Sequence, residues 1–260
     1  MADVRPLILI PSFNTGPILL HTVQSALALG TPVWVVFDGS TDGSPQLLRA
    51  LESPENPDLR ILRLPVNCGK GSAVLAGLRE AVSAGFTHLL TMDADGQHPA
   101  SSVNDFFRLS RIYPEAAIFG RPVFDKDAPA LRVNGRKVSN FWANLETLGW
   151  GIDDSLFGMR LYPAQFLLEV MESTPYARRF DFDPEVAVRL AWRGVPIINL
   201  ATPVRYLRAE DGGVSQFRYL RDNTLLTWMH LRLIIGFLVR FPLLIARGQN
   251  PLDHVSSTVR

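Results

Sequence analysis

Residues 89–98 read Leu-Leu-Thr-Met-Asp-Ala-Asp-Gly-Gln-His, an apolar run that ends in two carboxylates separated by one small residue. The run predicts a buried strand. Because residues i and i+2 of a strand lie on the same side, Asp93 and Asp95 are expected to point the same way at its carboxyl end. Gly96 allows the chain to turn there. Two convergent carboxylates suit a hard divalent cation such as Mg²⁺ or Mn²⁺. The alternative is a strand followed by a polar turn that binds no metal.

Three further apolar runs precede this segment, at residues 6–11, 32–37 and 59–64, and a helix pattern follows each of the four. Strand and helix in alternation, joined by short turns, predict an α/β fold with a parallel sheet covered on both faces. Ligands of such sheets bind where the carboxyl ends of the strands meet the loops. We therefore expect one site at that edge, built from Phe13, Asp38, Asp42, Lys70, Asp93 and Asp95.

The second half of the chain has a weaker pattern. Helices are expected at residues 99–111, 131–148 and 163–171, with another ending near Trp192, and short strands at 116–119, 195–199 and 204–206. Residues 210–215 are rich in glycine and acidic residues and are a candidate mobile loop.

The C-terminal stretch, residues 217–247, is long and apolar, but arginines and Pro242 interrupt it. No run of 18 uncharged apolar residues occurs, so we expect no transmembrane helix. A basic, aromatic-containing amphipathic helix can lie in a membrane interface. Packing on the core of the domain is the equally weighted alternative.

The composition is that of a globular protein: 47% of the 260 residues are hydrophobic, 20% are charged, and the net charge is +1. Nothing in this balance favours nucleic acid as a partner. The single cysteine, Cys68, excludes an internal disulfide and fits a reducing compartment. The N-terminus lacks the cationic start and long apolar core of a signal peptide.

Six segments, in order, resemble the catalytic domain of glycosyltransferase family 2, and the polyprenol-phosphate sugar synthases in particular. They are residues 10–14 (Ile-Pro-Ser-Phe-Asn), 38–44 (Asp-Gly-Ser-Thr-Asp-Gly-Ser), 67–73 (Asn-Cys-Gly-Lys-Gly-Ser-Ala), 92–98, 120–121 (Gly-Arg) and 154–160 (Asp-Ser-Leu-Phe-Gly-Met-Arg). The resemblance implies the GT-A nucleotide-diphospho-sugar transferase fold, with a Rossmann-like, mostly parallel sheet flanked by helices. It implies a catalytic domain over residues 1–210. Residues 211–260 would form an acceptor loop and a C-terminal amphipathic, membrane-associated helix.

The same resemblance implies roles for individual residues. Pro11, Phe13 and Asp38 would hold the base and ribose of a UDP or GDP donor, and Lys70 would lie near the base or the phosphates. Asp93 and Asp95 would bind the nucleotide and the metal, and Gln97 would border the sugar. Arg121, Asp154 and Arg160 would shape the acceptor side. Two departures weaken the prediction of the donor base: Thr15 stands where the family often has an acid, and Phe37 replaces the first of two acids.

Each role has a structural alternative. Asp38 and Asp42 could be turn residues that bind their own backbone. Lys70 could be a solvated charge on a helix, and Arg121 could cap the end of a strand. These alternatives need no ligand.

The family inverts configuration, and a hydroxyl acceptor needs a general base. Asp183 is the first candidate for that catalytic group and Asp181 the second. The alternative is that Asp183, which precedes Pro184, caps a helix. A lipid phosphate acceptor is already ionised and needs no base.

The leading hypothesis is an inverting, metal-dependent glycosyltransferase that moves a sugar from a nucleotide donor to a lipid-linked or other cell-envelope acceptor. It would be cytoplasmic and peripheral at the inner face of the membrane. A divalent cation and a basic residue would neutralise the charge that builds on the departing diphosphate. The alternatives are a non-catalytic, membrane-surface nucleotide-binding protein and a sugar-nucleotide nucleotidyltransferase.

Overall fold

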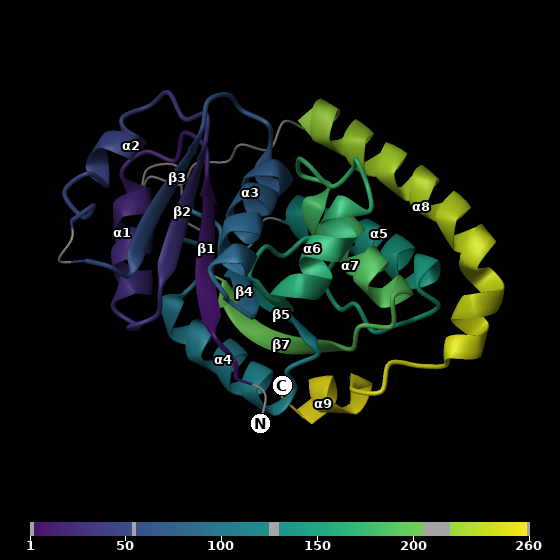
Figure 1. The fold of residues 1–260 in the computed structure, drawn as a ribbon. Coiled ribbons are helices and arrows are strands. Elements are labelled where there is room, and N and C mark those ends of the chain that lie inside the picture. Colours follow the sequence, from purple (N-terminus) through teal and green to yellow (C-terminus); the bar gives the residue numbers. More distant parts are fainter. Residues whose placement is uncertain (1–2, 54–55, 125–129, 205–218, 259–260) are drawn as a thin grey trace.

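A single seven-stranded sheet forms the centre of the molecule (Figure 1). The computed structural model describes residues 3–53, 56–124, 130–204 and 219–258. The strands lie in the order β3-β2-β1-β4-β6-β5-β7. Their bounds are β1 Pro6–Ser12, β2 Val33–Asp38, β3 Leu59–Leu64, β4 His88–Thr91, β5 Ala117–Phe124, β6 Arg160–Pro163 and β7 Ile197–Val204. Only β6, among these strands, runs antiparallel to its neighbours β4 and β5.

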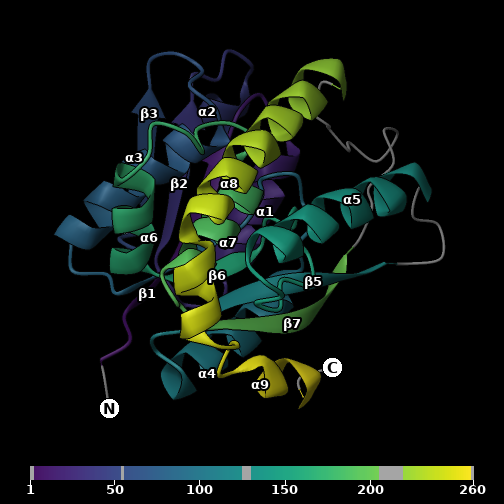
Figure 2. The same ribbon diagram turned by 90° about the vertical axis from the view of Figure 1, so that its right-hand side faces the viewer.

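Helices cover both faces of the sheet, as the alternating pattern predicts (Figures 1 and 2). They are α1 Ile18–Leu27, α2 Ser44–Leu47, α3 Lys70–Ser83, the 3₁₀ turn η1 Ala100–Ser102, α4 Val103–Ile112, α5 Ala130–Glu146, α6 Ala164–Glu172, α7 Phe182–Trp192, α8 Tyr219–Arg247 and α9 Asp253–Thr258. The central strands are apolar throughout because both of their faces are buried. The expected α/β fold is confirmed.

Two hydrophobic clusters lie on opposite faces of the sheet. Alternate residues of β1 supply them: Leu7 and Leu9 belong to one cluster, and Ile8 and Ile10 belong to the other. The first cluster packs under α3, α6 and α7, and the second under α1 and α4. All four side chains are fully buried. The parallel register of β1 with β2 and β4 brings the carboxyl ends of these three strands to one edge.

Several boundaries differ from those predicted. β4 ends at Thr91, so Asp93 and Asp95 lie in the turn beyond it, and strand alternation does not orient them. The prediction missed β6, because its four residues show no alternation and are buried between two neighbours. A single strand, β7, replaces the expected pair, since it pairs with β5 along its whole length. Residues 205–206 lie outside the described residues.

The long helix α8 corrects the membrane prediction. Residues Leu220–Arg247 are long and apolar enough to cross a membrane by length and composition, with a mean hydropathy of 1.8 over the best 18-residue window. The arginines are spaced widely enough to leave such a window. However, Met229 and Leu233 of α8 are buried in the same cluster as α3 and α7. The helix therefore packs on the sheet domain, along the side turned to the viewer in Figure 2. The predicted loop at 210–215 lies outside the described residues.

Candidate active site

The loops after β1 and β2 hold each other through side-chain hydrogen bonds. Asn14 has a left-handed backbone conformation (φ 48°), and its Oδ1 accepts a bond from the Thr41 N–H at 2.8 Å. Asp42 accepts from the N–H groups of Gly16 and Ser44, at 2.8 and 3.2 Å. Burial alone would raise the pKa of Asp42, but a hydrogen bond from the Ser44 hydroxyl, together with these N–H bonds, outweighs it, and the pKa lies below its usual value. Asp42 is therefore engaged as a turn residue, one of the two alternatives.

Asp38, at the end of β2, positions the start of α3. Its carboxylate accepts hydrogen bonds from the N–H groups of Cys68 and Gly69, both at 2.7 Å, and from the Asn67 amide at 3.0 Å. Gly69 has a φ of 102°, which side-chain-bearing residues rarely adopt. These contacts place Lys70, the first residue of α3, over the edge of the sheet. Asp38 is thus not bound to its own turn. Of the other expected donor residues, Pro11 is buried in β1 and Phe13 is half-buried just beyond it.

Lys70 joins two carboxylates from distant parts of the chain. Its Nζ lies 2.7 Å from Asp93 Oδ1 and 2.7 Å from Asp183 Oδ2. Asp93 follows β4, and Asp183 lies in the first turn of α7. Lys70 is therefore not a solvated helix charge, because most of its side chain is buried and its ammonium is paired with two carboxylates.

Burial and charge compete in this triad. Burial lowers the pKa of Lys70, but the carboxylates of Asp183 and Asp93 outweigh it, and the pKa lies above its usual value. For Asp93, the Lys70 charge outweighs burial and holds the pKa below its usual value. For Asp183, burial is the larger effect and raises the pKa in spite of Lys70. The ammonium therefore stays charged between its two partners.

The turn after Asp93 holds three further polar groups. His98 Nδ1 accepts a hydrogen bond from the Asp93 N–H at 3.2 Å, and its ring packs edge-on against Phe157, with centroids 4.7 Å apart. Burial lowers the pKa of His98 to about 4, so the ring is neutral at pH 7. Asp95 Oδ1 accepts from the Gln97 N–H at 3.1 Å. Burial, with the Asp93 charge added, raises the pKa of Asp95 to about 6.

Gly158 is a site residue to which the sequence argument assigned no role. A Cβ built at this position would lie 2.2 Å from Asp93 Oδ2 and 2.6 Å from Lys70 Nζ. The Gly158 carbonyl also accepts a bond from Thr91 Oγ1 at 2.9 Å. Its place within residues 154–160 was the available signal, but sequence does not show which atoms approach the backbone there.

Arg160 and Asp154, both predicted for the acceptor side, hold backbone segments next to Asp183. The Arg160 guanidinium is fully buried and donates to the carbonyls of Asp183 and Asp154, at 2.6 and 3.0 Å. It also stacks on Phe119 at 4.3 Å. The Asp154 carboxylate accepts from Arg136 Nη1 at 2.8 Å. Arg160 thus joins two backbone segments. Arg136, which was not predicted for the site, extends from α5 to the Asp154 carboxylate.

The remaining two predicted residues lie apart from this cluster. Arg121, on β5, is half-exposed, and its Nε lies 3.6 Å from Asp153 Oδ2. Asp181 accepts from the N–H groups of Ala177 and Arg179, at 3.2 and 2.9 Å. Ala177 has a φ of 60°, which is strained for alanine. Asp181 therefore stabilises the turn before α7. Since it also holds the position that begins α7, the idea that Asp183 caps this helix is wrong.

The carboxylates of Asp93 and Asp95 fit a divalent metal in part. Mg²⁺ bound with a nucleotide takes one or two carboxylates and completes its shell with phosphate oxygens and water. A close pair of carboxylates, one with a raised pKa, favours a bound cation. The described residues contain no group of three or more His, Cys, Asp or Glu side chains suited to hold a metal alone. The phosphates of a substrate would have to supply the missing ligands.

Comparison with solved structures supports the fold. S. aureus TarS 1–349 in complex with UDP-GlcNAc superposes with a TM-score of 0.55 at 15% identity. The match covers 82% of this chain and 62% of that one, so the chain spans about three-fifths of the solved protein. The expected GT-A fold is confirmed, with the C-terminal apolar helix present.

Sequence relatives extend over most of the chain. A polyprenol monophosphomannose synthase of Mycolicibacterium smegmatis is 26% identical over 221 residues, which are 81% of this chain and 82% of that protein. An undecaprenyl-phosphate mannosyltransferase of Micrococcus luteus is 24% identical, over 80% of this chain and 86% of that protein. The model of the family "Glycosyl transferase family 2" matches residues 7–168. The chain belongs to glycosyl transferase family 2 and is a glycosyltransferase.

Proposed function

We propose that this enzyme transfers a sugar, with inversion, from a nucleoside-diphosphate donor to a polyprenyl phosphate at a membrane surface. The names of the two relatives, which act on polyprenol and undecaprenyl phosphate, support the acceptor class. The UDP-GlcNAc bound to a protein of the same fold supports the donor class.

The observation that carries the proposal is the position of Lys70 between Asp93 and Asp183. Asp93 lies on the loop expected to meet the donor, and Asp183 lies on the helix expected to meet the acceptor. A fixed ammonium between them can stabilise charge that develops on the diphosphate as the bond to the sugar breaks. Because Lys70 opens a 14-residue helix, the positive end of the helix dipole adds to that field.

A phosphate acceptor suits this arrangement better than a hydroxyl acceptor. Oδ2 of the buried Asp183 carboxylate is paired with Lys70 at 2.7 Å, and the Lys70 charge opposes uptake of a proton by this candidate base. An ionised phosphate oxygen can attack the anomeric carbon without losing a proton. Asp183 then serves to hold Lys70 in place. The partly exposed guanidinium of Arg121, although it lies apart from the Lys70 cluster, has the geometry that suits a phosphate ligand.

Mg²⁺ or Mn²⁺, held by Asp93 and Asp95, would supply further charge neutralisation for the diphosphate. Lys70 supplies the positive charge next to Asp93. The carboxylate Asp95 has no such cation in direct contact within the described residues, so it is the expected principal ligand.

The membrane surface is met, in this proposal, by the outer faces of α5 and α8. Large apolar side chains stand exposed there: Val138, Phe141, Trp142 and Leu145 on α5, and Leu220, Trp228, Leu231, Ile235, Leu238, Val239, Phe241, Leu243 and Ile245 on α8. Both helices lie on the side of the molecule that faces the viewer in Figure 2. An apolar face of this size suits the boundary between headgroups and acyl chains. The inner face of α8 is buried on the domain, which favours an interfacial helix over a spanning one.

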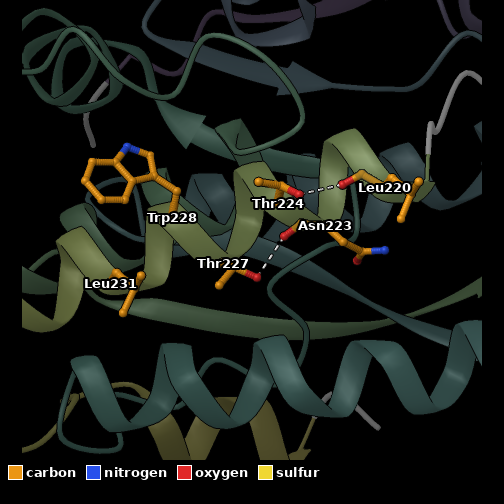
Figure 3. Close-up of a pocket in the computed structure, with 6 residues that line it drawn as sticks. All are labelled: Leu220, Asn223, Thr224, Thr227, Trp228 and Leu231. Atoms are coloured by element: carbon orange, nitrogen blue, oxygen red, sulfur yellow. Dashed lines mark hydrogen bonds between the residues drawn. The ribbon is translucent and has the colours of Figure 1, made fainter.

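A surface depression of about 400 Å³ lies on the outer side of α8 (Figure 3). Trp228, Leu231 and Leu220 contribute its apolar part. The hydroxyl groups of Thr224 and Thr227 donate to carbonyls of their own helix, at 2.8 and 2.9 Å, and need no other partner. The depression therefore suits an acyl or prenyl chain better than a polar ligand.

The test is a calorimetric titration with UDP and with GDP, each with and without Mn²⁺, followed by transfer assays with polyprenyl phosphate. Micromolar, metal-dependent binding of one nucleotide, lost in Asp95→Ala, would support the site and identify the donor base. Transfer from the matching nucleotide sugar to the lipid would support the acceptor. Binding without transfer would favour the non-catalytic alternative, and no binding by the folded protein would contradict the proposal.

A further inference from the structure

A network of buried hydrogen bonds connects the inner face of α8 to the neighbouring helix α5. His230 of α8 lies with Nδ1 2.8 Å from Glu146 Oε1 and Nε2 3.2 Å from Ser139 Oγ. Glu146 and Ser139 belong to α5, and all three residues are buried. One proton arrangement satisfies these contacts: Nδ1–H donates to the Glu146 carboxylate, and the Ser139 hydroxyl donates to Nε2.

The hydrogen-bond network continues from α5 to the loop at residues 153–156. Ser155 Oγ lies 2.9 Å from Ser139 Oγ and 2.8 Å from Asn140 Oδ1, and the Ser155 N–H donates to the same Asn140 oxygen at 2.7 Å. Ser155 is fully buried. The next residue toward the N-terminus is Asp154, whose carboxylate binds Arg136 of α5. When the single Ser155 hydroxyl hydrogen is donated to Ser139, three consecutive hydrogen bonds link Glu146, His230, Ser139 and Ser155, and Ser155 holds Asn140 through its N–H.

A second tie joins α8 to the helix that carries Asp183. Arg232, two residues after His230, lies 3.1 Å from Glu185 Oε2, and Glu185 is fully buried on α7. Neighbouring residues of α8 therefore hold α5 and α7, the two helices that supply Arg136 and Asp183. A displacement of α8 would act on both sides of the acceptor region, since buried polar networks have few alternative arrangements.

We propose that His230 is a positioning residue that couples the seating of α8 on a lipid surface to the placement of the 153–156 loop. The inference rests on the lipid-surface part of the proposed function. The outer face of α8 is apolar, and His230 lies on its inner face. The helix can respond to lipid on one side while it holds Ser139, and through it Ser155, on the other. Lipid against the outer face of α8 would then hold the loop with Asp154 more firmly in the hydrogen-bonded arrangement described above.

Two substitutions of His230 separate this role from a purely structural one. The amide of asparagine can replace Nδ1, so His230→Asn keeps the bond to Glu146 but loses the bond to Ser139. The longer glutamine can replace Nε2, so His230→Gln keeps the reach to Ser139. Ser139→Ala breaks the same link from the other partner and leaves His230 paired with Glu146. His21→Asn, at an exposed histidine of α1, is the matched control.

The readout is hydrogen exchange of the Ser155 and Leu156 amides, which donate to Asn140 Oδ1 and Asp154 Oδ1. Vesicles of phosphatidylcholine and phosphatidylglycerol, without polyprenyl phosphate, are added to each variant. In the wild type and His21→Asn, vesicles should slow this exchange about tenfold. His230→Asn and Ser139→Ala should bind vesicles equally well but show no slowing, and His230→Gln should retain part of it.

Kinetics give the second readout. His230→Asn and Ser139→Ala should raise KM for polyprenyl phosphate about tenfold, with the nucleotide affinity unchanged. Equal slowing of exchange in all variants, no slowing in the wild type, or no vesicle binding would overturn the inference. A purely structural His230 would instead make His230→Gln more harmful than His230→Asn. Absence of sugar transfer by the wild type would contradict the proposed function, while the exchange result would stand separately.

Discussion

The ammonium nitrogen of Lys70 lies 2.7 Å from the Asp183 carboxylate, although 113 residues separate the two along the chain. The same nitrogen lies 2.7 Å from Asp93. One buried cation thus holds together the loop after β4 and the first turn of α7. The distance between Asp93 and Asp183 therefore depends on these two contacts.

Lys70→Met should lower the rate of sugar transfer at least about 100-fold, because it removes the fixed positive charge beside the departing diphosphate. It should also destabilise the fold by about 3 kcal/mol, because two largely buried carboxylates lose their partner. Transfer rates and thermal unfolding measure the two effects. Lys70→Arg keeps the charge and should recover much of the stability. Wild-type turnover by folded Lys70→Met would contradict a role in the reaction.

Gly158→Ala should reduce transfer at least about tenfold, because the added methyl group would overlap Asp93 and Lys70 and push the ion pair apart. The measurement is kcat at saturating donor, with the melting temperature recorded beside it. Gly135→Ala is the matched control: nothing lies within 4 Å of its new methyl group, and alanine favours its helix by about 1 kcal/mol. Equal activity of the two variants would show that the site tolerates the shift.

Substitution of Asp181 should mainly lower the stability of the fold, whereas substitution of Asp183 should mainly lower the rate of sugar transfer. Asp181→Asn replaces one oxygen acceptor of the turn N–H groups and should cost about 1–3 kcal/mol of stability, with kcat of the folded protein retained. Asp183→Asn weakens the hold on Lys70 and should mainly lower kcat. Urea unfolding and steady-state kinetics on both variants make the comparison. A loss of kcat only in Asp181→Asn would reverse the assignment.

His98 should make the protein less stable as the pH falls from 6.5 to 4. Its pKa is about 4 in the folded protein and 6.5 in the unfolded chain, so the unfolded chain takes up the proton first. The difference corresponds to roughly 3 kcal/mol at pH 4. Asp95 has the opposite effect on stability: its pKa is raised to about 6 in the folded protein, so its protonation favours the folded state as the pH falls.

The effect of His98 is therefore measured as the difference in the free energy of unfolding between His98→Asn and the wild type. His98→Asn can still accept the Asp93 N–H bond but does not titrate, so its stability relative to the wild type should rise as the pH falls. Urea unfolding at pH 7, 5.5 and 4.5 in EDTA follows this difference. A constant difference over that range would mean that the pKa of His98 is the same in the folded protein as in the unfolded chain.

Ile235→Asp on α8 should weaken binding to vesicles about tenfold, because a buried isoleucine side chain contributes about 1.5–3 kcal/mol. Ile112→Asp on α4 is the matched control, since the two side chains are similarly exposed, at 65% and 55%. Sedimentation with anionic vesicles measures binding, and nucleotide titration should be unchanged in both. Equal loss in the two variants would exclude α8 as the lipid-binding face.

Local sequence predicted the first half of the fold well. The strands β1, β2 and β3 lie close to residues 6–11, 32–37 and 59–64, because a strand buried on both faces needs a continuous apolar run. The strand β6 was missed because its sequence is not a continuous apolar run, although the strand is buried. Its buried residues include Arg160, whose charge is satisfied by backbone carbonyls that only the fold brings near.

The sequence by itself determined the α/β alternation, the edge of the sheet at which Asp38, Lys70 and Asp93 gather, and the family. These depend on patterns within about ten residues, where burial and turn formation act on neighbouring side chains. Only the tertiary structure decided that Asp183, and not Asp181, meets Lys70, and that His230 reaches the loop of Asp154 through Ser139. Such contacts join residues about 100 apart along the chain. They depend on the path of the backbone between them, which no local pattern contains.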